Sequence, residues 1–259
     1  MKKLVVLSAF VLLTLGISAQ SAGSGYQFSV VKENPITSIK NQGNSGTCWS
    51  FSGLGFLESE VIRMGKGEHD LSEMYIVRRN YADKADKFVR VGGNLNFAQG
   101  GSFADVVETL NEYGVLPNEV YTGLNYGETM HKHGEVEAGL SGYVKGVNEN
   151  KNKRISPVWK QGLNGILDAY FGTVPQNFQY QGKSYTAGSL RQSLGLEASN
   201  YISLTSFTHH PFYAPFALEI PDNWRWSLSY NLPIDELMQT IDDALNNGYT
   251  VAWLSLIHI

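Results

Sequence analysis

Residues 42–51 read Gln42-Gly-Asn-Ser-Gly-Thr-Cys48-Trp-Ser-Phe51 and contain the single cysteine of this 259-residue chain. Apolar residues follow the cysteine at helical spacing: Phe51, Leu54, Leu57, Val61 and Met64. This spacing predicts an amphipathic helix that begins at Cys48. Free N–H groups and the positive end of the helix dipole favour an anion at a helix start. Because the thiolate is the nucleophilic form of cysteine, this position suits a reactive thiol.

The residues before the cysteine suit attack on a carbonyl group. Gln42 can donate its side-chain amide to an oxyanion, with the backbone N–H of Cys48 as a second donor. The Gly-Asn-Ser-Gly run at 43–46 lets the backbone approach a substrate closely. The alternative is a small buried cysteine with no chemical role. A Gln, a glycine-rich turn, Cys and Trp in this order favour the nucleophile.

This stretch resembles the active-site signature of the papain-like cysteine peptidases, including the Gln-to-Cys spacing. Three later segments resemble that family in the same order: Asp70-Leu-Ser-Glu-Met74, Gln99-Gly100-Gly101-Ser102 and Tyr113-Gly-Val-Leu-Pro117. Residues 26–253 are most similar to its bleomycin hydrolase and aminopeptidase C branch. The resemblance to this branch depends on two segments, Thr208-His-His-Pro211 and Tyr230-Asn-Leu-Pro-Ile-Asp-Glu236.

The resemblance implies an α+β, two-lobe peptidase fold, of which residues 26–253 hold mainly the helical lobe. Residues 127–200 correspond to a helical insertion of the branch, and most of the β-rich lobe is missing. The implied activity is hydrolysis of peptides through the Cys48 thiolate, as an aminopeptidase, with Gln42 at the oxyanion and Gly100 and Gly101 holding substrate backbone. No cofactor is implied, and the branch implies a homo-oligomer, a hexamer. The alternative is a catalytically dead, truncated chain that at most binds peptides.

The glycine pair lies just before a predicted helix. Ser102 with Asp105 three residues on resembles a capping box, and an apolar stripe from Phe103 to Tyr113 ends at Gly114. Backbone groups of Gly100 and Gly101 are then free to pair with an extended peptide, unless the pair is only a flexible turn.

Further elements follow from local patterns. Trp159, Leu163, Ile166 and Tyr170 predict a helix, and residues 178–185 predict a hairpin around Gln181-Gly182. Pro233 begins another predicted helix, which ends before Gly248, and residues 249–253 then open a predicted strand. The segment 131–137, His-Lys-His-Gly-Glu-Val-Glu, offers possible metal ligands but is interpreted as a solvated polar loop, so no metal site is assigned.

Composition limits the partners and the location. The chain is 42% hydrophobic and 17% charged with a formal net charge of −4, which is ordinary for a globular protein and gives a nucleic acid no electrostatic attraction. Lys2 and Lys3 followed by an apolar run to Ile17 predict an export signal at residues 1–19, or to Ala22, with a membrane anchor as the alternative. We therefore expect a periplasmic or secreted protein without stable membrane insertion.

A cysteine nucleophile of this kind needs a histidine, which an Asn or Asp orients. His209 or His210 with Asn223 is one candidate pair, but structural histidines are the preferred interpretation there. His258 lies in the tail Leu254-Ser-Leu-Ile-His-Ile259, one back-translation of which resembles a sequencing adapter. We therefore expect residues 254–259 to be non-native and the true histidine and asparagine to lie beyond the truncation.

Overall fold

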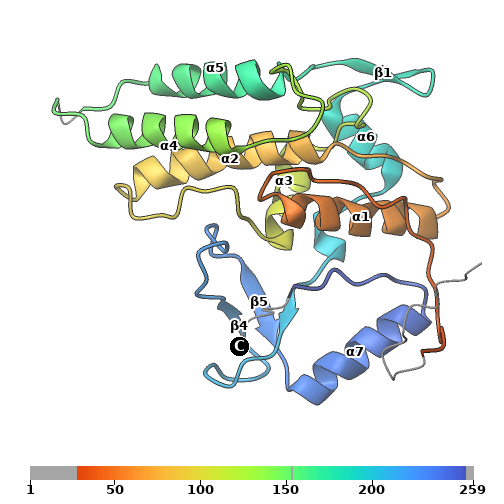
Figure 1. Ribbon diagram of the computed structural model, residues 1–259. Helices are drawn as coiled ribbons and strands as arrows, with labels where there is room; N and C mark the ends of the chain where they lie inside the picture. Colours follow the sequence, from red (N-terminus) through yellow and green to blue (C-terminus); the bar gives the residue numbers. More distant parts are fainter. Residues whose placement is uncertain (1–27, 153, 255–259) are drawn as a thin grey trace, which may run out of the picture. The chain divides into compact units, whose positions relative to one another are not determined.

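The computed structural model describes residues 28–152 and 154–254 (Figure 1). The chain divides into two units, 1–33 and 34–259. In the first unit, residues 28–33 form neither helix nor strand, and Phe28, Val30 and Val31 are exposed. All of the helices and strands described below belong to the second unit. The predicted signal peptide at 1–19 and the tail residues 255–259 lie outside the described residues.

Three helices carry the sequence motifs. Helix α1 (Cys48–Arg63) begins at the cysteine, as predicted, and α2 (Glu73–Arg90) begins after Ser72, whose hydroxyl accepts a hydrogen bond from the backbone N–H of Tyr75. Helix α3 (Phe103–Tyr113) has the predicted capping box between Ser102 and Asp105. Side-chain capping satisfies N–H groups that the first helical turn leaves without partners. Because the capping residues lie within a few positions of each helix start, these starts can be predicted from short stretches of sequence.

Two further helices pack on α2. Figure 1 shows α4 (Gly134–Asn148) and α5 (Trp159–Phe171) side by side, and both contact α2. The predicted stripe of α5 is confirmed, and Leu163 is buried. The shared core is built from apolar side chains of these helices, among them Leu54, Leu57, Met74, Tyr81, Val106, Leu110, Leu140 and Leu167.

The predicted hairpin is also present. Strands β1 (Phe178–Tyr180) and β2 (Lys183–Tyr185) pair antiparallel, and both turn residues, Gln181 and Gly182, have positive φ. Two consecutive positive φ angles are typical of the two-residue hairpin turn that matches strand twist. Helix α6 (Ala187–Leu194) and a short 3₁₀ helix η1 (Ala198–Asn200) follow.

A small mixed sheet forms the last part of the described chain. Its order is β3 (Leu204–Thr205), β5 (Leu228–Asn231) and β4 (Pro215–Ala217), with β3 parallel and β4 antiparallel to the central strand. Helix α7 (Ile234–Asn246) begins after Pro233, as predicted, but none of its residues is fully buried. None of the helices in the described part of the chain is long and apolar enough to cross a membrane.

Two local predictions are wrong. Residues 249–253 form no strand in the structure, and Tyr249 and Trp253 are exposed. A strand requires a neighbour that accepts its backbone hydrogen bonds, and no described strand lies beside this segment. Segment 131–137 is not a solvated loop either, because His133 is fully buried and α4 begins at Gly134.

Candidate active site

Cys48 is exposed at the first position of α1. The preceding residue, Thr47, is fully buried, and its carbonyl oxygen accepts hydrogen bonds from the N–H groups of Ser50 and Phe51 at 2.9 and 3.3 Å. The thiol is therefore exposed to solvent at the N-terminus of α1, which is the positive end of the helix dipole. The buried Thr47 holds this helix start in place. A carbonyl substrate can reach a thiol in this position.

The loop before the cysteine is closed by its own polar groups. The Nε2 atom of half-buried Gln42 donates to the carbonyl oxygen of Ser45 at 2.6 Å, and the Ser45 hydroxyl donates back to the Gln42 carbonyl at 2.8 Å. A side-chain amide carries two N–H donors. One donor of Gln42 thus holds the loop, and the second stays available for an oxyanion.

Gln99 connects this loop to two other parts of the chain, a role that sequence analysis missed. Its Oε1 atom accepts from the backbone N–H of Gly46 at 2.6 Å, and its Nε2 atom donates to Glu137 of α4 at 2.5 Å. Its backbone oxygen accepts from the indole N–H of Trp49 at 3.0 Å. The only sequence signal was its position directly before the glycine pair.

The glycine strip lies against the residue that follows Cys48. Gly101 is buried, and a Cβ atom on it would lie 2.8 Å from Cε2 of Trp49, which is closer than real Cβ contacts. Trp49 is itself buried. The residue that follows Cys48 therefore packs directly on the strip, and a side chain at 101 would clash with its indole ring.

Gly100 faces two charged side chains. Its carbonyl oxygen accepts from the ammonium of Lys84 at 2.5 Å, and a Cβ atom on Gly100 would lie 2.2 Å from a carboxylate oxygen of Asp222. Lys84 is 2% exposed and also donates to the carbonyl oxygen of Ala98 at 2.9 Å. Asp222 is exposed at this point. Neither side chain was singled out from the sequence, because the contacts join distant segments.

The Lys84 ammonium belongs to a charged cluster under the strip. Burial lowers the pKa of Lys84 to about 8, and the charge of Asp105 opposes this shift. Arg225 donates to Asp105 at 2.9 Å and to Asp83 at 2.6 Å. These ion pairs connect the 222–227 loop to α3, through Asp105, and to α2, through Asp83.

The candidate catalytic residues near the end of the described chain have hydrogen-bond partners other than Cys48. Among the residues that the structure describes, no hydrogen bond joins Cys48 to a histidine. His210 is bonded to Glu219 at 2.7 Å, and Asn223 donates to the carbonyl oxygens of Leu218 and Ser227. The structure thus does not pair His210 with Asn223, and His258 lies outside the described residues.

His133 is bonded, through its backbone, to the loop at 42–47 that precedes Cys48. Its backbone N–H donates to the Asn44 carbonyl at 3.1 Å, while its ring stands edge-on to Phe171 with centroids 5.3 Å apart. Neither ring nitrogen has a hydrogen-bond partner among the described residues. Burial, together with the proximity of His131, lowers the pKa of His133 to about 4, so the ring is neutral at physiological pH.

Comparison with known proteins identifies the family. The protein-family model described as papain family cysteine protease matches residues 26–190. Cysteine proteinase 2 of Entamoeba histolytica is 28% identical over 159 residues, which are 60% of this chain and 46% of that protein. The viral cathepsin of Mamestra configurata nucleopolyhedrovirus is 42% identical over 50 residues, 19% of this chain and 15% of that protein.

A solved structure extends the likeness in fold. The crystal structure of PepW from Lactobacillus rhamnosis HN001 aligns with a TM-score of 0.68 and 17% identity, covering 85% of this chain and 59% of that one. The chain therefore spans only part of the proteins that it matches. The expected papain-like α+β fold, mainly helical with few strands, is confirmed. Since the family model covers more than half of the sequence, this chain belongs to the papain family of cysteine proteases.

Proposed function

We propose that the whole protein is a cysteine peptidase in which Cys48 attacks the scissile carbonyl of a peptide. The observation that carries this proposal is the exposed Cys48 thiol at the start of α1, where the next residue, Trp49, packs against Gly101 of the strip. Attack converts the carbonyl to a tetrahedral oxyanion and then to a thioester, with release of the amine and later hydrolysis by water. The backbone N–H of Cys48 and the second amide N–H of Gln42 are the proposed oxyanion donors.

The general base is the part of this chemistry that the described residues do not supply. A histidine must take the thiol proton and later give a proton to the leaving amine. Since no described histidine is bonded to Cys48, we assign this role to a segment outside the described residues. The same observation favours the second candidate, a chain that binds peptides without cleaving them.

We further propose aminopeptidase specificity of the bleomycin hydrolase type. The segments 208–211 and 230–236 resemble that branch, and the Asp222 carboxylate beside Gly100 supports the proposal. A peptide paired with the strip would lie near this carboxylate, which would attract a positively charged group such as the free α-ammonium of a substrate. An internal peptide segment has no charge at that point, so Asp222 would favour substrates with a free N-terminus.

The test of peptidase function uses the protein translated from the complete gene. We expect it to hydrolyse fluorogenic aminoacyl amides, and we expect Cys48→Ala to abolish turnover while the fold is retained by circular dichroism. Cys48→Ser serves as a second variant of nearly the same size. Unchanged turnover in either variant would refute the role of Cys48, and peptide binding without turnover by the wild type would favour the binding function.

The specificity test compares free and N-acetylated versions of one substrate. Asp222→Asn should lower kcat/KM for the free amine by about tenfold, as expected for loss of a partly exposed charge-assisted contact. It should leave the acetylated substrate unaffected. Asp235→Asn, at the exposed start of α7, is the matched control. Equal effects of Asp222→Asn on both substrates would contradict the assignment but leave the peptidase proposal standing.

A further inference from the structure

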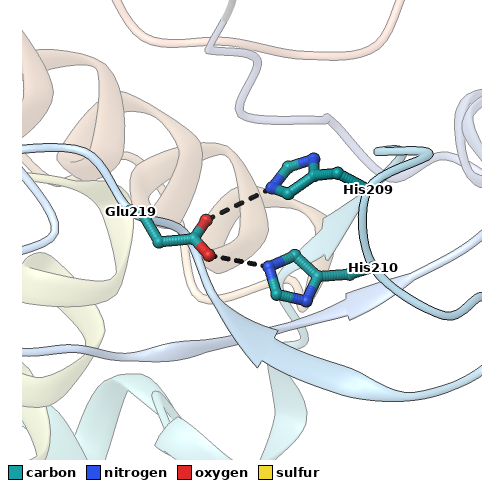
Figure 2. Close-up of side chains that lie close together, drawn as sticks. All are labelled: His209, His210 and Glu219. Carbon is teal, nitrogen blue, oxygen red and sulfur yellow. Dashed lines mark hydrogen bonds and ion pairs between the residues drawn. The ribbon is translucent and has the colours of Figure 1, made fainter.

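Figure 2 shows a cluster outside the candidate active site, in which two neighbouring histidines point at one carboxylate. The Nε2 atom of His210 lies 2.7 Å from Oε1 of Glu219, and the Nε2 atom of His209 lies 3.4 Å from Oε2. His209 and His210 lie between β3 and β4, and Glu219 follows β4. The cluster therefore joins the two ends of the segment that contains β4.

We propose that His209, His210 and Glu219 form a binding site for a divalent transition-metal ion such as Zn²⁺. Zinc commonly takes imidazole nitrogens and a carboxylate oxygen, and three protein ligands leave one position for water. The three donor atoms here lie within 4.8 Å of one another. Metal–ligand bonds of about 2.0–2.1 Å place the ligand atoms of a tetrahedral site ~3.3 Å apart. The 3.4 Å between Nε2 of His209 and Oε2 of Glu219 matches this separation, and the 2.7 Å between Nε2 of His210 and the other carboxylate oxygen, Oε1, is shorter by less than 1 Å.

The donors are held in place by their surroundings. The ring of His210 stacks on Phe216, with centroids 4.0 Å apart, and Phe207 stands edge-on to His209 at 5.4 Å. The buried side chain of Asn231 accepts from the N–H of Phe207 and donates to the carbonyl oxygens of Phe207 and His210. The ring contacts hold the two imidazoles, and Asn231 holds the backbone. Binding an ion would therefore order few further groups, and the entropy cost of such ordering is what weakens binding at a flexible site.

The charge and exposure of the cluster also suit a cation. Glu219 supplies the acidic ligand, and both histidines contact its carboxylate oxygens. The side chains of His209 and Glu219 are 55% and 60% exposed, so the site opens to solvent on one side. One anionic and two neutral ligands would leave the bound ion with a net positive charge, which suits a water molecule as the remaining ligand.

Another group of acidic side chains shows why this cluster differs. Glu58, Asp70 and Glu73 also bring their carboxylate oxygens together, but the ammonium of Lys40 lies between them at 2.7, 2.6 and 2.9 Å. That group already contains its cation. No lysine or arginine is paired with Glu219 among the described residues.

The expected consequence of binding is structural. An ion held by His209, His210 and Glu219 would link the two ends of segment 209–219, which contains β4. Binding would favour the folded state by RT ln(1 + [Zn²⁺]/Kd). The melting temperature should therefore rise with Zn²⁺ concentration. This proposal does not depend on the proposed peptidase function, because Cys48 contributes no ligand.

The experiment uses the 259-residue chain with Cys48→Ser, which removes a competing thiol. After treatment with EDTA and dialysis, Zn²⁺ is titrated in competition with a chromophoric chelator, and the melting temperature is followed in parallel. We expect one Zn²⁺ per chain with a Kd in the micromolar range or below, no comparable binding of Mg²⁺, and a tetrahedral Co²⁺ absorption spectrum. His210→Gln and Glu219→Gln should each weaken Zn²⁺ binding by at least about tenfold.

The variants and controls separate loss of a ligand from loss of fold. Gln at 210 can still donate a hydrogen bond to Glu219, so the loop can remain connected without the imidazole ligand. Glu197→Gln, at a similarly exposed glutamate, and His131→Gln should bind Zn²⁺ like the parent. The proposal is overturned if the parent does not bind Zn²⁺ at submillimolar concentration, if His210→Gln and Glu219→Gln bind it equally well, or if Mg²⁺ binds as tightly.

Discussion

Acidification should destabilise the chain through His133. This side chain is fully buried and has no hydrogen-bond partner for either ring nitrogen among the described residues. Its pKa is lowered from 6.5 to about 4 by burial and by the proximity of His131. A lowered histidine pKa means that the folded state prefers the neutral ring, whereas the unfolded state takes up a proton as soon as the pH falls below 6.5. Stability is therefore lost as the pH falls from 6.5 toward 4.

The size of this loss follows from proton linkage. At pH 7.5 the ring is neutral in both states, and the linkage contributes almost nothing. At pH 5 the unfolded ring is almost fully protonated and the folded ring is mostly neutral, which lowers the free energy of unfolding by about 2 kcal/mol. The loss approaches about 3 kcal/mol below pH 4, where both states are protonated.

Urea denaturation of the wild type and of His133→Leu, followed by tryptophan fluorescence at both pH values, measures this difference. Leucine has a similar volume and cannot take up a proton, so its stability relative to the wild type should increase by about 2 kcal/mol from pH 7.5 to pH 5. His131→Gln, which removes a half-buried ring nearby, should retain most of the pH dependence. If the difference between wild type and His133→Leu is the same at both pH values, the buried neutral histidine is not the cause.

Three other substitutions test the surroundings of Cys48 and the helical core. Gly101→Ala places a carbon atom 2.8 Å from the indole ring of Trp49. It should lower the free energy of unfolding by about 1–3 kcal/mol and change the rate of alkylation of the Cys48 thiol. Gly55→Ala, with open space around the added carbon, should do neither. Lys40→Met leaves the buried carboxylates of Glu58 and Glu73 without their cation. It should lower the free energy of unfolding, measured in urea, by about 3–5 kcal/mol. An unchanged midpoint of urea unfolding would contradict that pairing. Gln99→Leu removes the acceptor of the exposed Gly46 N–H and should lower the free energy of unfolding by about 0.5–1.5 kcal/mol, with faster hydrogen exchange at Gly46. Normal protection of that amide would show that the bond is not formed in solution.

The parts of the fold that could be predicted are those determined within a few residues. The start of α1 at Cys48, the capping box at Ser102 and the turn at Gln181-Gly182 depend on spacing, capping and allowed φ angles, and the structure confirms all three. The failed strand at 249–253 shows the limit, because a β-rich composition forms a strand only where another strand accepts its hydrogen bonds.

Other features depend on contacts between distant residues and were not predictable. His133 is flanked by charged residues in the sequence, which suggested solvent, but α4 and Phe171 enclose it. The carboxylate of Asp222 and the ammonium of Lys84, from segments far apart in the sequence, both lie close to Gly100. A single sequence contains no local signal for such pairs, since neither residue changes the pattern of its own segment.

These distant contacts decide how the candidate active site is held. The signature loop at 42–48 is closed by its own hydrogen bonds, but its position relative to the strip depends on Gln99, whose side chain bonds both Gly46 and Glu137 of α4. Helix α4 lies in the segment 127–200, which the family resemblance assigned to a helical insertion. A nucleophile and its substrate strip must keep their relative position to within a fraction of an ångström for efficient reaction. The segment that begins at residue 127 therefore acts as a support for the candidate site, and its contribution is expected to be positional, through Glu137 and the Asn44–His133 backbone bond, with no group of its own at the reacting carbonyl.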